Sequence, residues 1–137
     1  MKKTTTLLLL LLISTLALSQ GKVNNDFTGI WTVQNANISK GLDSQVQKMM
    51  LIMKNAFTGS KFHFNENGKF KIELKDKVNP MMEEMTTMLN GQNWRYFKTE
   101  KKIEVGQNHL VMFVKKQDGK YYFKLSDTPL TLVMKKN

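Results

Sequence analysis

Two hydrophobic periods organise the chain after residue 20. Short segments in which apolar and polar residues alternate are typical of strands with one face in water. Two other segments, 41–57 and 79–90, place apolar residues every three or four positions, as on one face of a helix. Turn residues such as Asn67-Gly68 separate neighbouring segments. The pattern predicts these two helices among eight strands, at 29–35, 60–65, 69–75, 92–98, 101–105, 109–116, 120–125 and 130–135.

Both predicted helices have recognisable start signals and an apolar stripe. Ser44 and Gln47 fit a capping box for the first helix. Asn79 fits the N-cap of the second, with Pro80 at its first helical position. The expected stripes are Leu42, Val46, Met49, Met50, Met53, Ala56 and Phe57 on the first helix, and Met81, Met82, Met85, Met88 and Leu89 on the second.

The short links between successive strands favour an antiparallel up-and-down barrel. Closing such a sheet removes its exposed edges, so the last strand is expected to pair with the first. We therefore predict a mainly β fold, an eight-stranded antiparallel barrel with two short inserted α-helices. The 137 residues are enough for one domain, which we expect to cover residues 20–137.

The N-terminal segment has the pattern of a secretory signal peptide. Lys2 and Lys3 precede an uncharged apolar run at 7–18, and small residues near Ser19 offer a cleavage site. The run is shorter than the roughly 20 residues that cross a bilayer, so no stable membrane insertion is expected. We predict a signal peptide at 1–19 and a secreted or periplasmic product. Because the chain has no cysteine, its core must hold it together without disulfides.

The net charge of +10 raises the question of an anionic partner. Arg95 is the only arginine, whereas recognition of phosphates and bases favours the planar guanidinium. The lysines also alternate with apolar residues, as in 69–75, which is typical of a solvated strand face. We expect no nucleic-acid partner, and a loose attraction to anionic surfaces or acidic ligands stays open.

The first predicted strand opens with Gly29 two residues before Trp31. Glycine lets the backbone enter the strand without a Cβ, and the large ring two residues later lies on the same face. There Trp31 can plug the floor of the barrel, so we expect structural roles for Gly29 and Trp31.

The opening NDFTGIW at 25–31, the segment DGKYYF at 118–123 and the closing LTLVM at 130–134 resemble the small lipocalin-like domains exported by Bacteroidetes. The resemblance implies the binding or transport of a small apolar molecule, and it implies no catalysis. True lipocalins stack an arginine from beyond the last strand on the tryptophan. No arginine follows the last strand here, and Lys135 and Lys136 are the two candidates to replace it.

Most of the ten methionines fall on the two predicted helices. Methionine is flexible and polarizable, so a surface of methionines can repack around ligands of different shape. The alternative is that these residues only fill the core beneath the helices. The residues that we predict to bind a ligand are Met50, Met53, Met85, Met88, Trp94, Tyr96 and Phe123.

Arg95 has two alternative orientations. It alternates with Trp94 and Tyr96 along one strand, so it points outward if these aromatics point inward. An inward Arg95 would be the natural partner of a ligand carboxylate. The outward orientation is favoured because Trp94 and Tyr96 cover more apolar area.

No motif of catalysis or metal binding is present. His63 and His109 belong to no metal-ligand spacing, and there is no thiol nucleophile, G-x-S-x-G motif or phosphate loop. The neighbouring carboxylates of Glu83 and Glu84 are explained by their place at a helix N-terminus. We expect no enzyme, no metal and no cofactor.

Two hypotheses of function follow. The first is an exported lipocalin-like protein that binds a small hydrophobic or amphipathic molecule in the barrel, capped by the Met-rich helices. The second is a filled barrel that acts as a protein-interaction module of the cell envelope. The sequence does not identify the ligand or the partner.

Overall fold

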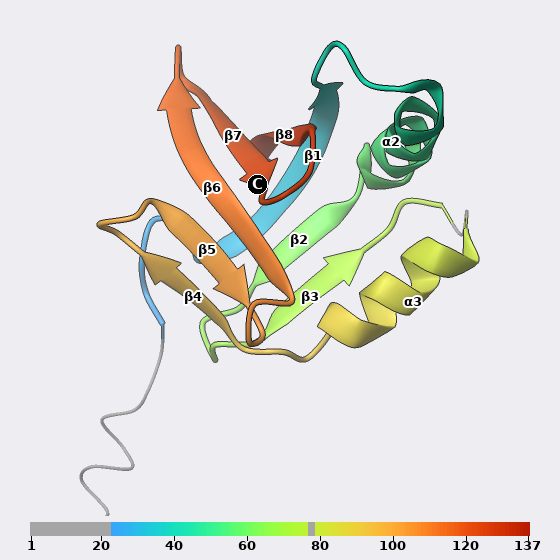
Figure 1. The fold of residues 1–137 in the computed structure, drawn as a ribbon. Coiled ribbons are helices and arrows are strands. Elements are labelled where there is room, and N and C mark those ends of the chain that lie inside the picture. The colour runs from blue at the N-terminus through green and yellow to red at the C-terminus, as the bar shows by residue number, and fades with distance from the viewer. Residues whose placement is uncertain (1–22, 77–78) are drawn as a thin grey trace, which may run out of the picture.

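The computed structural model describes residues 23–76 and 79–137 (Figure 1). These residues form two helices, α2 (Ser44–Phe57) and α3 (Pro80–Leu89), and eight strands: β1 (Gly29–Ile38), β2 (Lys61–Phe64), β3 (Phe70–Glu73), β4 (Trp94–Phe97), β5 (Lys102–Val105), β6 (Leu110–Gln117), β7 (Lys120–Leu125) and β8 (Leu130–Lys136). The predicted signal peptide at 1–19 lies outside the described residues. None of the helices in the described ranges has the length and hydropathy needed to span a membrane.

All eight strands described belong to one antiparallel sheet in the order β3-β2-β1-β8-β7-β6-β5-β4. The first and last strands pair as predicted, from Trp31 opposite Lys136 to Ile38 opposite Leu130. The sheet curls into a nearly closed barrel, with both helices on one side of it (Figure 1). The predicted eight-stranded antiparallel barrel with two inserted helices is therefore confirmed.

β1 is longer than predicted, because it continues past Asn35 to Ile38. Its register against β8 shifts between Val33 and Asn35, which marks an irregularity of the β-bulge type. A bulge adds one residue to one strand and bends it. β1 thereby keeps its pairing with β8 for three residues beyond the predicted end.

The barrel is incompletely paired at one seam, between β3 and β4. Within the described residues these two strands form no ladder, and a single bridge joins the residues just before them, Lys69 opposite Asn93. The Phe70 amide donates to the Gln92 carbonyl at 2.8 Å, and the Ile72 amide donates to Oδ1 of Asn90 at 2.7 Å. Residues that follow α3 thus satisfy the backbone of β3 where a neighbouring strand is missing.

The start of α3 agrees with the sequence prediction, whereas the start of α2 does not. Asn79 is the N-cap of α3, and its side chain accepts from the Met81 amide at 2.8 Å. The predicted capping box of Ser44 and Gln47 is wrong, because Asp43 caps α2 by accepting from the Val46 amide at 2.9 Å. Aspartate is as good an N-cap residue as serine, so sequence preference alone does not separate these two adjacent positions.

The apolar stripes of both helices are narrower than predicted. On α2, Met50 is buried, but Met49 beside it is 51% exposed. On α3, Met82 and Leu89 are buried, whereas Met81 and Met88 are 44% and 45% exposed. Each helix lies on the barrel along one line of residues, so members one position off that line face solvent.

Side chains fill the interior of the barrel. Alternate residues point inward in strands such as β3, where Phe70 and Ile72 are buried and Lys71 and Glu73 are exposed. The interior residues that are at most 1% exposed include Val33, Phe62, Phe64, Phe70, Ile72, Trp94, Ile103, Val105, Met112, Phe123, Leu130 and Leu132. Eight strands form a barrel just wide enough for such a packing.

The segment before β1 closes the floor of the barrel. Phe27 is 5% exposed, and its ring centroid lies 5.7 Å from that of Trp31. The Trp31 indole donates from Nε1 to the Phe27 carbonyl at 2.9 Å. On the outer side of Trp31, Nζ of Lys136 lies 5.9 Å from the ring and donates to the Asp26 carbonyl. Lys136 rather than Lys135 takes the position predicted for a cation over Trp31.

Candidate functional site

The end of the barrel opposite the floor is a mouth formed by α2, α3 and two loops. In an up-and-down barrel, alternate connections lie at the same end. The connections that contain α2 and α3 therefore share the mouth with the β5–β6 loop (106–109) and the β7–β8 loop (126–129). A cavity of about 470 Å³, which we call the mouth cavity, lies between these elements.

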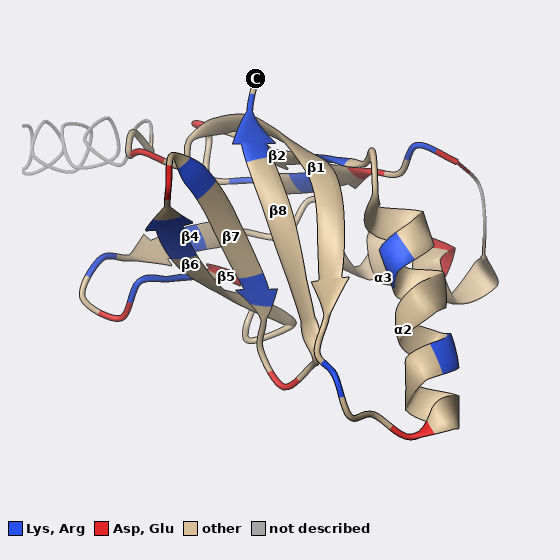
Figure 2. Ribbon diagram, turned by 90° about the horizontal axis from the view of Figure 1, so that it is seen from above, with Lys and Arg blue, Asp and Glu red and all other residues tan. Residues whose placement is uncertain are grey.

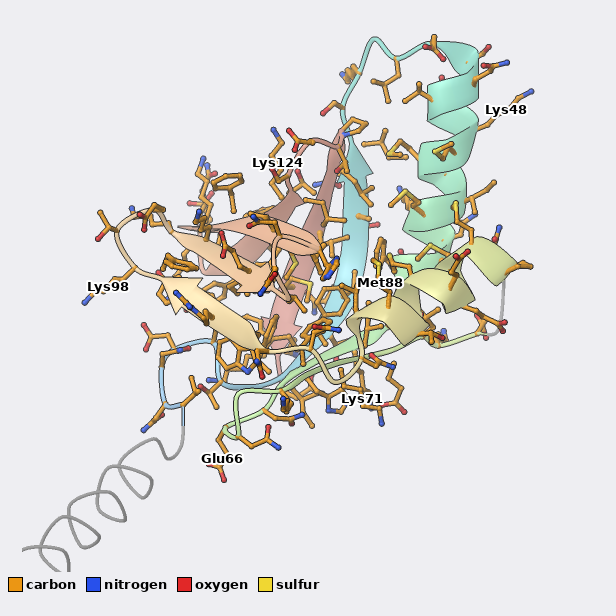
Figure 3. All side chains as sticks on the ribbon, turned by 60° about the horizontal axis from the view of Figure 1, so that its bottom comes forward. Lys48, Glu66, Lys71, Met88, Lys98 and Lys124 are labelled. Atoms are coloured by element: carbon orange, nitrogen blue, oxygen red, sulfur yellow. The ribbon has the colours of Figure 1, made fainter. Side chains whose placement is uncertain are left out.

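Methionines form the helical wall of the mouth cavity. Met53 of α2 and Met85 of α3 both line it, and both are half-buried. Met50, one turn before Met53, is 5% exposed and packs in the core. Met88, one turn after Met85, lies on the edge of α3 that faces α2 (Figure 3). The structure thus brings together the two predicted methionines Met53 and Met85 from separate helices.

The opposite wall combines apolar strand ends with a polar rim. Leu110, Val111 and Leu125 contribute the apolar part. The β7–β8 loop is fixed by the Thr128 hydroxyl, which donates to the Leu125 carbonyl at 2.9 Å and accepts from the Leu130 amide at 3.2 Å. This wall is therefore held in place by hydrogen bonds between the Thr128 side chain and the backbone, and the flexible wall is the one made of methionines.

The three predicted aromatic residues lie away from the mouth cavity. Trp94 is buried, its ring centroid lies 5.1 Å from that of Phe64, and its Nε1 donates to the Asn65 carbonyl. Phe123 is fully buried, with its ring centroid 5.3 Å from that of Trp31. Tyr96 lines a separate cavity of about 440 Å³ beside Phe27. Of the seven residues predicted to bind a ligand, Met53 and Met85 are therefore the two that line the mouth cavity.

The sequence prediction missed the loop residues of the mouth cavity. Asn108, His109, Ser126, Asp127 and Thr128 all line it. They carry no motif, and their two segments are separated by strands β6 and β7. The only available signal was topological, because alternate connections of the predicted barrel must lie at one end.

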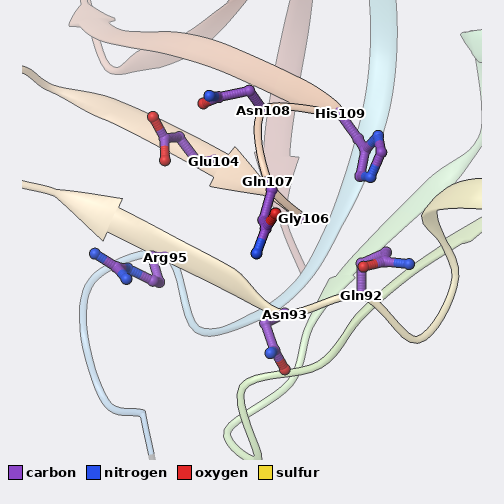
Figure 4. Close-up of a pocket in the computed structure, with 8 residues that line it drawn as sticks. All are labelled: Gln92, Asn93, Arg95, Glu104, Gly106, Gln107, Asn108 and His109. Carbon is purple, nitrogen blue, oxygen red and sulfur yellow. The ribbon is translucent and has the colours of Figure 1, made fainter.

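A second, more polar cavity lies on the outside of the barrel, against β4 and β5 (Figure 4). It has a volume of about 610 Å³, and Arg95 and Glu104 line it together with asparagine and glutamine side chains. Arg95 is exposed, and its guanidinium carbon lies 5.0 Å from the centroid of the Phe97 ring. Arg95 therefore has the outward orientation that the sequence favours.

Basic residues are spread over the strands and loops of the barrel in the view of Figure 2. His63 and Glu73 form one polar pair on the outside of the barrel, with Nε2 and Oε2 3.1 Å apart. This hydrogen bond, helped by the nearby Lys71, holds the pKa of Glu73 below its ordinary value. Within residues 23–76 and 79–137, no group of three or more His, Cys, Asp or Glu side chains could hold a metal ion.

Comparison with known proteins gives no relative for this chain: no family model matches it, and neither does any curated protein or solved structure.

Proposed function

We propose that this protein is an exported lipocalin-like binding protein that takes a small hydrophobic or amphipathic molecule at the barrel mouth. One observation carries the proposal, which is the cavity of about 470 Å³ between the Met-rich helices and the strand ends. Its volume falls in the range of about 300 to 1,000 Å³ that is usual for small-molecule sites. Because the interior of the barrel is filled, the ligand would lie above the aromatic core and not inside it.

The composition of the walls favours an amphipathic ligand. Met53, Met85 and Leu110 offer apolar contact to a chain, and Asn108 and Ser126 offer hydrogen bonds to a polar head. No lysine or arginine lines the cavity, and Asp127 is its carboxylate. A neutral or cationic head should therefore be preferred over an anionic one, although the protein carries a net charge of +10.

Fluorescent probes with the same alkyl chain and a neutral, cationic or anionic head test this proposal. We expect saturable binding at micromolar concentration, tightest for the neutral and cationic probes. Native mass spectrometry and lipid extraction of the purified protein should detect a bound ligand. Absence of both probe binding and extractable ligand would exclude a binding function for the mouth.

Two variants of α3 give a matched comparison. Met85→Glu puts a carboxylate into the cavity wall and should weaken probe binding more than about tenfold, because a charge buried without a partner is costly. Met81→Glu places the same change on an exposed position of the same helix and should leave probe binding unchanged. Equal effects of the two variants would contradict a ligand site at the cavity.

A set of four conservative changes tests why the wall is made of methionine. Changing Met50, Met53, Met85 and Met88 together to leucine should preserve folding, since each swap typically costs less than about 1.5 kcal/mol. The apolar area stays, but the adaptability of the thioether chain is lost. We expect a linear probe to keep its affinity while bulky or bent probes lose theirs.

The second candidate, an interaction module of the cell envelope, is favoured by a different observation. Most of the large hydrophobic residues exposed in the described part of the chain are on the helices, namely Met49, Leu51, Ile52, Met81 and Met88. A protein partner on this surface would be lost on Met81→Glu and kept on Met85→Glu, the reverse of the order expected for the ligand. Pull-down with both variants therefore separates the two functions.

A further inference from the structure

Three elements contribute soft or borderline donor atoms to the mouth cavity. Met53 of α2 and Met85 of α3 each have a thioether sulfur, and His109, next to the start of β6, has an imidazole; His109 also lines the polar cavity beside β4 and β5. Thioether sulfur selects Cu(I) among the biological metals, and imidazole also binds copper. The chain has no cysteine, so no thiolate competes for such an ion.

The imidazole of His109 is held in place and is available. A Cβ at Gly106 would lie only 2.5 Å from Cδ2 of His109, so the ring packs directly on this glycine. Gly106 has a φ of 67°, which also favours glycine. Among the described residues, no hydrogen bond to the ring nitrogens of His109 is formed. Figure 4 shows the ring turned away from Arg95 and Glu104.

Two further thioethers lie on the same side of α3 as Met85, although they do not line the cavity. Met81, Met85 and Met88 are spaced four and three residues apart, which puts them on one side of the helix. Met88 is 45% exposed and lies on the edge that faces α2, as labelled in Figure 3. A methionine side chain has three rotatable bonds, so Met88 can turn toward an ion held by Met85.

The charge around the cavity suits a cation. The residues that line it include Asp127 and neither a lysine nor an arginine, although the chain as a whole has 21 of them. Thioethers are neutral and carry no proton, so binding a monovalent ion would bury a single positive charge near this carboxylate. The long-range repulsion by the lysines is screened within about 10 Å at ordinary salt.

We propose that the mouth cavity binds a soft monovalent metal ion, copper(I), through the sulfur atoms of Met53 and Met85 and an imidazole nitrogen of His109. Met88 is the nearest additional thioether. The cavity is the same as that proposed for the apolar ligand, but binding of the ion depends on donor atoms and not on apolar area. The proposal therefore does not rest on the function proposed for the cavity.

Silver(I) nitrate in chloride-free buffer is the probe, because Ag(I) has the charge and closed shell of Cu(I) and needs no reductant. The protein labelled with methyl-¹³C methionine is titrated and followed by NMR and calorimetry. We expect one ion per chain, with large shifts for the methyls of Met53 and Met85. The methyls of Met112 and Met134, which are buried in the barrel, should not shift.

Matched variants identify the ligands. Met53→Leu with Met85→Leu should weaken Ag(I) binding more than about tenfold, as should His109→Gln. The controls, Met112→Leu with Met134→Leu and His63→Gln, should leave the affinity unchanged. Circular dichroism checks that each variant folds.

Loss of Ag(I) binding by the folded Met53 and Met85 leucine variant, with unchanged affinity in the Met112 and Met134 leucine control, would support the proposal. The proposal would be overturned if the leucine variant kept the Ag(I) affinity of the wild type. It would also be overturned if the wild type did not bind one Ag(I) ion per chain. Neither result depends on whether the apolar probes bind, so the two proposals can fail separately. The same titration with Cu(I) under anaerobic conditions should reproduce the ligand set.

Discussion

Trp31 is enclosed on several sides at the floor of the barrel. Its ring centroid lies 4.9 Å from that of Tyr121 and 5.3 Å from that of Phe123, and its indole nitrogen donates to the Phe27 carbonyl. The ring therefore combines a large apolar contact with a satisfied polar atom, which is the favourable way to bury tryptophan. Because it contacts the N-terminal segment and β7 together, Trp31 joins parts of the chain that are distant in sequence.

Replacing Trp31 by alanine should destabilise the protein by about 3 to 5 kcal/mol, the range for emptying a buried aromatic site. Denaturant unfolding followed by circular dichroism measures this change. Trp31→Phe keeps most of the apolar contact and should lose clearly less. A change below about 1 kcal/mol for Trp31→Ala would mean that the ring contributes little to the packing.

The lowered pKa of Glu73 predicts how the stability of the protein depends on pH. The pKa of Glu73 is lowered in the folded state, first of all by the hydrogen bond to His63. A lowered pKa means that the ionised carboxylate stabilises the fold above its unfolded value of about 4.5, and that this stabilisation is lost as the pH falls through the folded value. Glu73→Gln should therefore reduce the dependence of stability on pH below about 4.5 and leave the profile near pH 7 parallel to wild type. Unfolding curves across this range measure the effect.

The sequence predicts the place of some residues in the fold and not that of others. The place of Trp31 in the first strand is indicated by its spacing to Gly29, whose φ of 132° favours a glycine. The place of His109 in the mouth cavity does not follow from any local pattern. It depends on how the β5–β6 loop meets two helices from other parts of the chain.

The beginning of α2 shows how a helix boundary depends on one side chain. Asp43→Ala should cost about 1 kcal/mol, because the Val46 amide loses its acceptor at the first turn. Ser44→Ala, the neighbouring change, should cost less than about half of that, since Ser44 is inside the helix and does not cap it. Thermal unfolding of the two variants, followed at the helix signal, makes the comparison. A larger loss of stability for Ser44→Ala than for Asp43→Ala would instead support the capping box predicted from the sequence.

Asn90 connects the end of α3 to the unpaired edge of β3. Its Oδ1 accepts from the Ile72 amide at 2.7 Å, and its own amide caps the helix through the Thr86 carbonyl. Asn90→Ala should cost about 1 to 3 kcal/mol, because the amide of a buried strand residue is left without an acceptor. Asn90→Asp keeps the acceptor oxygen and should cost less, and hydrogen exchange of the Ile72 amide should increase only in the alanine variant.

The positions of the strands and helices along the chain were more predictable than the side of each helix that is buried. Alternation and turn residues are local properties, so the strands and helices could be predicted from short windows. The exposure of Met49, Met81 and Met88 could not, because it depends on the angle at which each helix lies on the barrel. A stripe of apolar residues limits that angle but does not fix it.

For the whole molecule, closure of the barrel determines both the core and the site. The number of strands and their short links predict the closure, and the structure confirms a nearly closed barrel in which β1 pairs with β8. The sequence leaves open whether the interior is filled, and it does not predict the cavity at the mouth. Both depend on the summed volume of side chains from every strand, and packing of that kind has no local signature.

The pairing of β1 with β8 also has a consequence for the order in which the chain folds. β4 to β8 can pair one after another as local hairpins, whereas β1 must wait for a strand about a hundred residues later, as the hydrogen bond between Thr32 and Asn137 across 105 residues indicates. Contacts between such distant residues slow folding, because a long loop must close before they form.

During synthesis, β1 therefore keeps an unpaired edge until β8 has left the ribosome, and an open strand edge is a site of aggregation. We expect chains stalled before residue 130 to be sensitive to protease and prone to self-association, and release of the last strand to end both.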